Sequence, residues 1–284
     1  MTTRILICDD SALARKQMAR ALPEGLRGDV SFAKDGVEAL EKLRGGEAEL
    51  LFLDLNMPEM DGYQVLEQIR EEDLPVMTIV VSGDIQPEAR DRVKKLGALD
   101  FIKKPTETCT VLDLLVEYGV YRPGELEDSA LQDSSLKSIG SAAPEISVSL
   151  NDYLQEISNV AMGRSSDLLA RLLRVFVKQP IPKVAFLANS ELHMAISSVS
   201  DSDTYSAVCQ GFTGAGIAGE ALLLFADASF QEMAEMLHYD TLVGEAVNVE
   251  VLMDMSSILF GAFLKGIGDQ LDLKLGLGHP TVLG

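Results

Sequence analysis

The pattern of hydrophobic and polar positions changes twice along the chain. In the first 122 residues, short apolar runs alternate with segments whose apolar residues recur at a helical period. The apolar runs are residues 4–8, 29–33, 50–55, 76–82 and 99–103, and helical segments such as residues 11–22 and 37–46 follow them. This alternation predicts five βα units around a buried parallel sheet, which is a doubly wound α/β fold.

The pattern is lost between residues 123 and 149. These 27 residues are rich in Ser, Glu, Asp, Pro and Gly and show no sustained periodicity. They predict a flexible, acidic, Ser-rich linker. Four apolar residues leave room for a short helix in its place, although coil is the favoured interpretation: Leu126, Leu131, Leu136 and Ile139.

The pattern of hydrophobic and polar positions changes again between residues 150 and 284. Helical periodicity occupies residues 151–178 and 247–272. Strand-like runs lie between them, at residues 184–188, 192–197, 204–212 and 219–226. The pattern predicts a second domain of the α+β class.

Charge and cysteine content exclude several classes of function. The chain has 24 Lys+Arg against 44 Asp+Glu, a net charge of −20, so polyphosphates and anionic membranes would repel it, and we expect no nucleic-acid partner. The second domain is itself acidic and has no helix-turn-helix pattern, which disfavours a transcription regulator. Three scattered cysteines, Cys8, Cys109 and Cys209, suggest neither disulfides nor zinc. No uninterrupted apolar stretch approaches the roughly 18 residues of a spanning helix, so we expect a cytoplasmic protein without membrane insertion.

Polar residues follow the predicted strands of the first domain. Asp9 and Asp10 come after the first strand and Asp54 after the third. Ser82 closes the fourth and Lys104 follows the fifth. Because ligands of such folds bind at the carboxyl ends of the strands, these groups are expected to meet. Three crowded carboxylates favour a hard divalent cation such as Mg²⁺, and a lysine beside them suits a phosphoryl group.

These residues stand in a familiar arrangement. The segments ILICDD, LLFLDLNMPEMDG, IVVSGD and GALDFIKKP resemble the CheY-like receiver domain of two-component response regulators, across residues 1–122. The resemblance implies that Asp54 is the phospho-acceptor and that a histidine kinase supplies the phosphoryl group. It implies that Mg²⁺ is bound by Asp10, Asp54 and the backbone carbonyl of Asn56, with Asp9 acting through a water or a second oxygen contact.

The same resemblance assigns roles around the phosphoryl group. Ser82 and Lys104 would contact its oxygens, and Phe101 would be the aromatic switch residue. The Lys104–Pro105 bond is typically cis in this family. Gly62, which follows Asp61, suits a tight turn that needs a positive φ.

The second domain contains an internal repeat at an offset of 98 residues. Without a gap, four residues of the first copy (Asp152, Glu156, Asn159 and Pro182) align with four of the second (Glu250, Asp254, Ser257 and Pro280). Helical spacing puts the first three on one face, offset from the apolar residues and pointing outward. A solvated acidic helix face is the simpler interpretation of such a pattern.

The combination of residues in the first copy is more specific as a motif than any one of those residues alone. Its pattern, acid–x3–Glu–x2–Asn–x22–Pro, resembles the CheC/CheX family of chemotaxis phosphatases, over residues 150–284. The glycine-punctuated segment CQGFTGAGIAGEALLLFAD resembles strands of that family. The resemblance implies that Glu156 meets the lysine of a phosphorylated partner receiver and that Asn159 orients the attacking water. In the second copy Asp254 and Ser257 depart from the pattern, so weak or no activity is expected there.

These resemblances combine into one hypothesis. The chain would be a chemotaxis response regulator whose output domain is a hydrolase, a phosphatase acting on the phospho-aspartate of a separate receiver. The alternative is a phosphorylation-controlled binding adaptor without phosphatase activity. Only four residues follow Pro280, so we also expect a shortened version of a longer domain.

Overall fold

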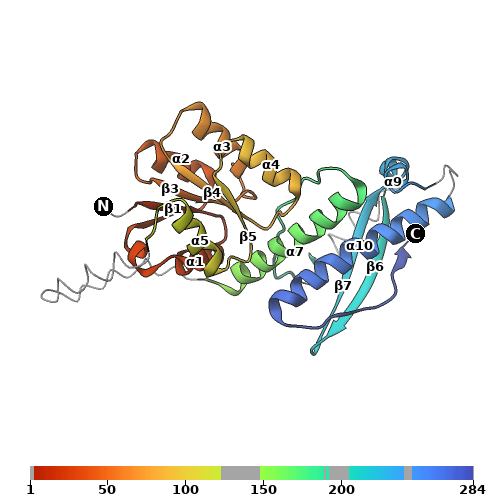
Figure 1. Ribbon diagram of the computed structural model, residues 1–284. Coiled ribbons are helices and arrows are strands. Elements are labelled where there is room, and N and C mark those ends of the chain that lie inside the picture. Colours follow the sequence, from red (N-terminus) through yellow and green to blue (C-terminus); the bar gives the residue numbers. More distant parts are fainter. Residues whose placement is uncertain (1–2, 123–147, 189, 192–204, 240–244, 284) are drawn as a thin grey trace, which may run out of the picture. The chain divides into compact units, whose positions relative to one another are not determined.

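The computed structural model describes residues 3–122, 148–188, 190–191, 205–239 and 245–283 (Figure 1). These residues form two compact units, and the division lies between Glu156 and Ile157. All of the predicted linker except Val148 and Ser149 lies outside the described residues. So do the possible short helix within it and the strand-like run 192–197.

The first unit contains the predicted parallel sheet. Its strands are β1 (Ile5–Cys8), β2 (Val30–Ala33), β3 (Leu50–Leu53), β4 (Met77–Ser82) and β5 (Asp100–Lys103), in the order β2-β1-β3-β4-β5. The helices are α1 (Ala12–Ala21), α2 (Gly36–Arg44), α3 (Gly62–Glu71), α4 (Pro87–Lys95) and α5 (Thr108–Glu117), with a short 3₁₀ helix, η1, at Glu24–Asp29. The five predicted βα units are therefore confirmed.

The sheet is buried on both faces because its side chains alternate between two apolar clusters. Leu6 and Cys8 of β1 pack with α2, α3 and α4 on one face. Ile5 and Ile7 pack with α1 and α5 on the other. Burial on both faces explains why the strands read as continuous apolar runs rather than as alternating patterns.

The second unit combines long helices with an antiparallel sheet. Helix α7 (Leu150–Leu173) starts in the first unit and continues into the second. The remaining elements are β6 (Tyr205–Gly214), β7 (Ile217–Ala226), η2 (Asp227–Ser229), α9 (Phe230–Met236), α10 (Glu245–Leu271), β8 (Gly276–Leu277) and β9 (Thr281–Leu283). Strand β6 pairs with β7 on one side and with β8 and β9 on the other.

The predicted helices and two of the predicted strands are found here. The run 184–188 forms no strand, and α7 ends five residues before the predicted residue 178. The early end has a local cause: Arg174 has φ 56°, which breaks the helical backbone.

The internal repeat is structural as well as sequential. Helices α7 and α10 end at aligned residues, Leu173 and Leu271. The next residues, Arg174 and Asp272, have φ angles of 56° and 53°. The same terminal hydrogen bond follows in each copy, from Val175 N to Ala170 O and from Leu273 N to Gly268 O. Two helices that end in the same way 98 residues apart support a duplicated unit.

Helices α7 and α10 contact each other closely. A Cβ on Gly266 would lie 2.9 Å from Ala161 Cα, so the glycine permits the approach. Gln270 Nε2 donates to Ile157 O at 3.0 Å, and Arg164 forms an ion pair with Asp269. The other side of α10 packs on the sheet in one apolar cluster: Val208, Phe230, Val251, Leu252, Met255 and Phe260.

Among the described residues, one helical stretch, Asn248–Leu271, is long and apolar enough to cross a membrane by length and composition alone. A core helix has the same properties, and this stretch carries the buried side chains that pack on β6.

Candidate functional site in the receiver pocket

The carboxyl ends of the parallel strands bring the predicted acidic residues together. Ligand oxygens of Asp9, Asp10 and Asp54 all lie within 4.8 Å of one another. Asp9 and Asp54 are buried and Asp10 is half-buried. Asp54 Oδ2 accepts a hydrogen bond from Asn56 N at 3.0 Å. This all-oxygen donor set, with one partly open member, fits Mg²⁺.

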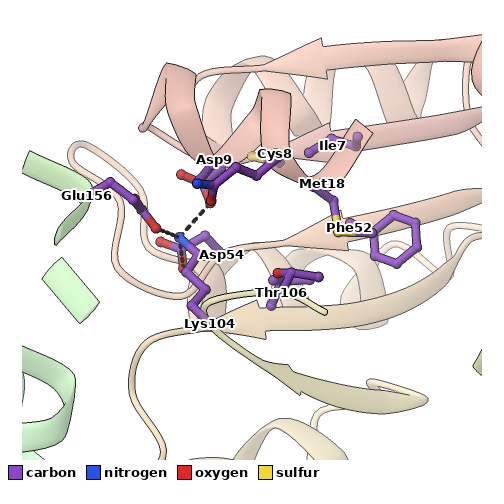
Figure 2. Close-up of a pocket in the computed structure, with 12 residues that line it drawn as sticks. Ile7, Cys8, Asp9, Met18, Phe52, Asp54, Lys104, Thr106 and Glu156 are labelled. Atoms are coloured by element: carbon purple, nitrogen blue, oxygen red, sulfur yellow. Dashed lines mark ion pairs between the residues drawn. The ribbon is translucent and has the colours of Figure 1, made fainter. Parts of the chain in front are cut away.

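Lys104 stands opposite these carboxylates. Its ammonium lies 2.7 Å from Asp9 Oδ2 and 3.2 Å from Asp54 Oδ1, and its side chain is 3% exposed. Figure 2 shows a third partner, Glu156, whose Oε1 lies 3.4 Å from Lys104 Nζ. Glu156 is the last residue of the first compact unit. The lysine is thus held by three carboxylates in a water-poor site.

Burial controls the charges of this pocket. It raises the pKa of Asp9 and Asp54, and that of Asp10 to about 6, while Lys104 opposes each of these shifts. Burial alone would lower the pKa of Lys104, but Asp54, Asp9 and Glu156 together hold it well above its usual value. One lysine cannot neutralise all of these carboxylates, so the pocket favours a further cation.

The other residues predicted for phosphoryl contact and switching surround the pocket. Ser82 is fully buried, and its Oγ accepts a hydrogen bond from Asp84 N at 3.2 Å. Phe101 is buried, with the guanidinium of Arg90 5.4 Å from its ring centre. The Lys104–Pro105 bond is cis, as predicted. The roles of the Phe101 ring and of the Asn56 carbonyl remain predictions.

The prediction that Gly62 is needed for a turn with a positive φ is wrong. Gly62 is not among the glycines with a positive φ in the described part of the chain. Instead, a Cβ at this position would lie 2.2 Å from the carbonyl oxygen of Asp54 and 2.9 Å from Leu55 Cα. A side chain is excluded here because the start of α3 packs directly on the backbone of Asp54 and Leu55.

The expectation that the motif residues of α7 point outward is also wrong for two of them. Glu156 and Asn159 are each 5% exposed. Glu156 is paired with Lys104, and the side chain of Asn159 accepts a hydrogen bond from Gln179. Asp152 is half-buried and exchanges hydrogen bonds with Ser149, so it caps the start of α7.

The second copy has different contacts. Asp254 is exposed and accepts a hydrogen bond from the hydroxyl of Tyr239, which raises the pKa of Tyr239 to about 12. Ser257 is exposed. Glu250 is exposed, and Pro182 and Pro280 are both half-buried. The aligned acid of α10 is therefore hydrogen-bonded to a tyrosine, whereas Glu156 is paired with a lysine.

Three residues near these sites were missed by sequence reasoning. Thr106 lines the pocket, and Arg15 donates to the carbonyl oxygens of Asp9 and Asp10. Their closeness to Lys104 and to the Asp pair along the chain was a usable signal. Gln179 reaches Asn159 from 20 residues away, outside any pattern, so no local signal identified it.

Comparison with known proteins identifies the first unit. Residues 5–115 match the response regulator receiver domain family. Over 115 residues the chain is 34% identical to the chemotaxis protein CheY of Bacillus subtilis, which covers 40% of this chain and 96% of that protein. The chain belongs to the response regulator receiver family.

One further relative is longer than the matched region, and one solved complex contains a similar chain. A protein-glutamate methylesterase/protein-glutamine glutaminase of Geobacter sulfurreducens is 33% identical over 120 residues, 42% of this chain and 32% of that protein. The chain thus spans about a third of the length of the methylesterases it matches. A solved CheX–CheY complex with BeF3 and magnesium from Borrelia burgdorferi includes a similar chain, with 28% identity, a TM-score of 0.38, and coverage of 42% of this chain and 90% of that one.

Membership gives the first unit a general role. It is a receiver domain of two-component and chemotaxis signalling. Receiver domains take a phosphoryl group from histidine kinases and typically bind Mg²⁺ at the acidic pocket, which corresponds here to the cluster of Asp9, Asp10 and Asp54.

Proposed function

We propose that this chain is a response regulator phosphorylated on Asp54, and that its residues 150–284 form a CheC/CheX-like phosphatase acting on phospho-aspartate in receiver domains. The observation that carries the proposal is the ion pair between Glu156 and Lys104, at 3.4 Å. Lys104 is the lysine of a receiver pocket, and Glu156 is the acid that the α7 motif assigns to such a lysine. The pair supports recognition of a receiver site by this carboxylate.

The phosphorylation step uses residues already in place. Asp54 attacks the donated phosphorus, and the bond between that phosphorus and the donor breaks. Lys104 lies beside Asp54 and compensates the charge that the phosphoryl oxygens bring. Asp9, Asp10 and Asp54 would hold Mg²⁺, which supplies further charge neutralisation when bound.

The removal step is a hydrolysis. A water oxygen attacks phosphorus, the bond to the aspartyl oxygen breaks, and the products are a free carboxylate and inorganic phosphate. Asn159 follows Glu156 by three residues, so the two side chains leave α7 on the same face. An amide both donates and accepts hydrogen bonds, and so it can orient water without a shifted pKa.

The substrate receiver is proposed to be a separate protein. Rapid removal of the phosphoryl group from the chain's own Asp54 would erase the signal that the kinase delivers. The attached receiver then acts as the regulator of the phosphatase, and a phosphorylated partner receiver acts as its substrate.

Release of phosphate from a phosphorylated receiver tests this function. We expect the full chain to accelerate release, and the Asn159→Ala variant to lose that acceleration. A protein that only binds a receiver could use the same ion pair of Glu156 as a phosphatase. A binding adaptor is therefore the competing function. An adaptor predicts binding that depends on Glu156 without any acceleration of phosphate release by the wild-type chain.

A further inference from the structure

We infer that Gln179 positions the amide of Asn159 for the proposed hydrolysis, an inference that rests on the proposed function. Gln179 Nε2 lies 3.1 Å from Asn159 Oδ1 and 3.1 Å from the backbone oxygen of Asn159. Gln179 is 6% exposed and Asn159 is 5% exposed. Both residues belong to the second unit, so the contact is internal to it.

The two hydrogen bonds determine which way the Asn159 amide faces. A backbone carbonyl oxygen only accepts, so the Gln179 atom that contacts it must be the NH₂ group. The Asn159 atom that contacts the same NH₂ must then be the oxygen. Asn159 therefore directs its own NH₂ group away from Gln179 and keeps a second lone pair on Oδ1. Rotation of the Asn159 amide by a half turn would bring two NH₂ groups together, and Gln179 disfavours it.

This arrangement matters because water positioning requires a defined donor and a defined acceptor. An asparagine side chain without such a partner can exchange its oxygen and nitrogen by rotation about its last bond. A fixed orientation of the amide presents Oδ1, the acceptor, on the same side in every round of hydrolysis. Holding that orientation in advance lowers the cost of ordering the amide at the transition state.

Two observations favour this role over simple packing. The Oε1 of Gln179 is buried and has no hydrogen-bond partner among the described residues. Leaving such an atom unpaired is costly, so packing alone would favour an apolar residue. The second copy has no glutamine at the aligned position: Leu277, which lies in β8 and is 42% exposed, aligns with Gln179 at the offset of 98, where Ser257 aligns with Asn159. The glutamine is thus present in the copy that has the asparagine and absent from the copy that does not.

The test compares two glutamine substitutions in the full chain. Gln179→Met keeps the side-chain length but removes the donor. Gln270→Met is the matched control, because Gln270 Nε2 also donates to a backbone oxygen of α7, that of Ile157, without touching Asn159. With a phosphorylated receiver as substrate, we expect Gln179→Met to lower kcat about tenfold and to change KM less than about twofold. Gln270→Met should leave both constants within about twofold of the wild type.

A second comparison separates positioning from stability. In an Asn159→Ala background the positioning role no longer exists, so Gln179→Met should cause no further loss of kcat. Gln179→Leu, which also lacks a donor, provides a second variant of similar size and should show the same loss as Gln179→Met. A wild-type kcat for Gln179→Met, or equal losses with and without Asn159, would overturn the inference. Absence of hydrolysis by the wild-type chain would instead overturn the proposed function.

Discussion

At the scale of single residues, the pocket is a balance of buried charges. Asp9 and Asp54 are both buried, and the ammonium group of Lys104 forms ion pairs with them. Burial raises the pKa of each carboxyl group, so Lys104 alone stabilises the carboxylates poorly and a further cation is favoured. Phosphorylation adds further negative charge, which makes the requirement stronger.

Asp54→Asn should abolish phosphorylation of the receiver. The amide is a far weaker nucleophile than the carboxylate, and removal of Mg²⁺ by a chelator should also stop labelling of the wild type. Mass spectrometry after treatment with a small phosphodonor measures both effects. Asp61→Asn is the control, because Asp61 caps α3 and asparagine also caps helices. Labelling of the Asp54→Asn chain at the wild-type level would refute the assignment.

Gly62→Ala should destabilise the first unit. The added Cβ would meet the carbonyl oxygen of Asp54 at 2.2 Å, so the backbone must move. We expect a loss of about 1–3 kcal/mol in the free energy of unfolding, measured with urea, together with slower phosphorylation. Gly28→Ala is the control, since a Cβ there meets nothing within 4 Å. Equal stability of the two variants would show that the start of α3 adjusts without strain.

At the scale of elements, the second unit contains two helices that end alike but differ in their chemistry. Helix α7 has Glu156 and Asn159, and α10 has Asp254 and Ser257 at the aligned positions. The second pair is exposed, and Asp254 is engaged by Tyr239. The duplication therefore supports the packing of the unit, whereas one copy alone keeps the residues proposed for catalysis.

Alanine substitutions should separate the two helices. Asn159→Ala should lower kcat about 100-fold, because a lost transition-state hydrogen bond has an effect of this order. Glu156→Ala should mainly raise KM, because docking against a lysine is lost. Asp254→Ala and Ser257→Ala should retain most of the activity. Rates of phosphate release at several substrate concentrations provide the four comparisons, and equal losses in both helices would contradict the asymmetry.

Tyr239→Phe should reveal a structural role for Asp254. The folded pKa of Tyr239 is raised to about 12, so its hydrogen bond stabilises the fold below pH 10 and is lost as the pH rises toward 12. We expect a loss of at most about 1 kcal/mol in the free energy of unfolding, since the pair is solvated. The loss should be constant between pH 7 and pH 9 in urea titrations. A loss that varies across this range would point to a different titrating group.

At the scale of the whole molecule, the proposal gives one chain both a phospho-acceptor and a phosphatase, so it allows two routes of hydrolysis. A chain acting on itself loses phosphate at a rate independent of protein concentration. A chain acting on another receiver does so at a rate that rises with the concentration of the acting chain.

Two variants of the chain distinguish these routes. Asp54→Asn chains cannot be phosphorylated but retain α7, and Asn159→Ala chains can be phosphorylated but should not hydrolyse. After labelled Asn159→Ala chains are mixed with Asp54→Asn chains, we expect little phosphate release, because the proposed substrate is the receiver of a separate protein and not Asp54 of another copy. Release that occurs only in the wild type alone, at a rate independent of concentration, would show that each chain acts on itself.

The sequence by itself determined most of the receiver. Continuous apolar runs predicted five buried strands, because a parallel sheet covered on both faces requires apolar side chains throughout. The acidic residues and Lys104 were located correctly, because parallel strands end at one edge of the sheet. The repeat at 98 residues was visible because α7 and α10 keep the same order of residues.

Tertiary structure decided what depends on atoms from distant segments. Gly62 is constrained by the carbonyl of Asp54, and Asn159 by a glutamine 20 residues away that belongs to no pattern. Helical periodicity placed Glu156 and Asn159 on a polar face, but periodicity cannot distinguish a face that meets water from one whose polar groups are paired. The cost of burying them is offset by an ion pair with Lys104 and a hydrogen bond from Gln179, partners that only the folded chain brings within reach.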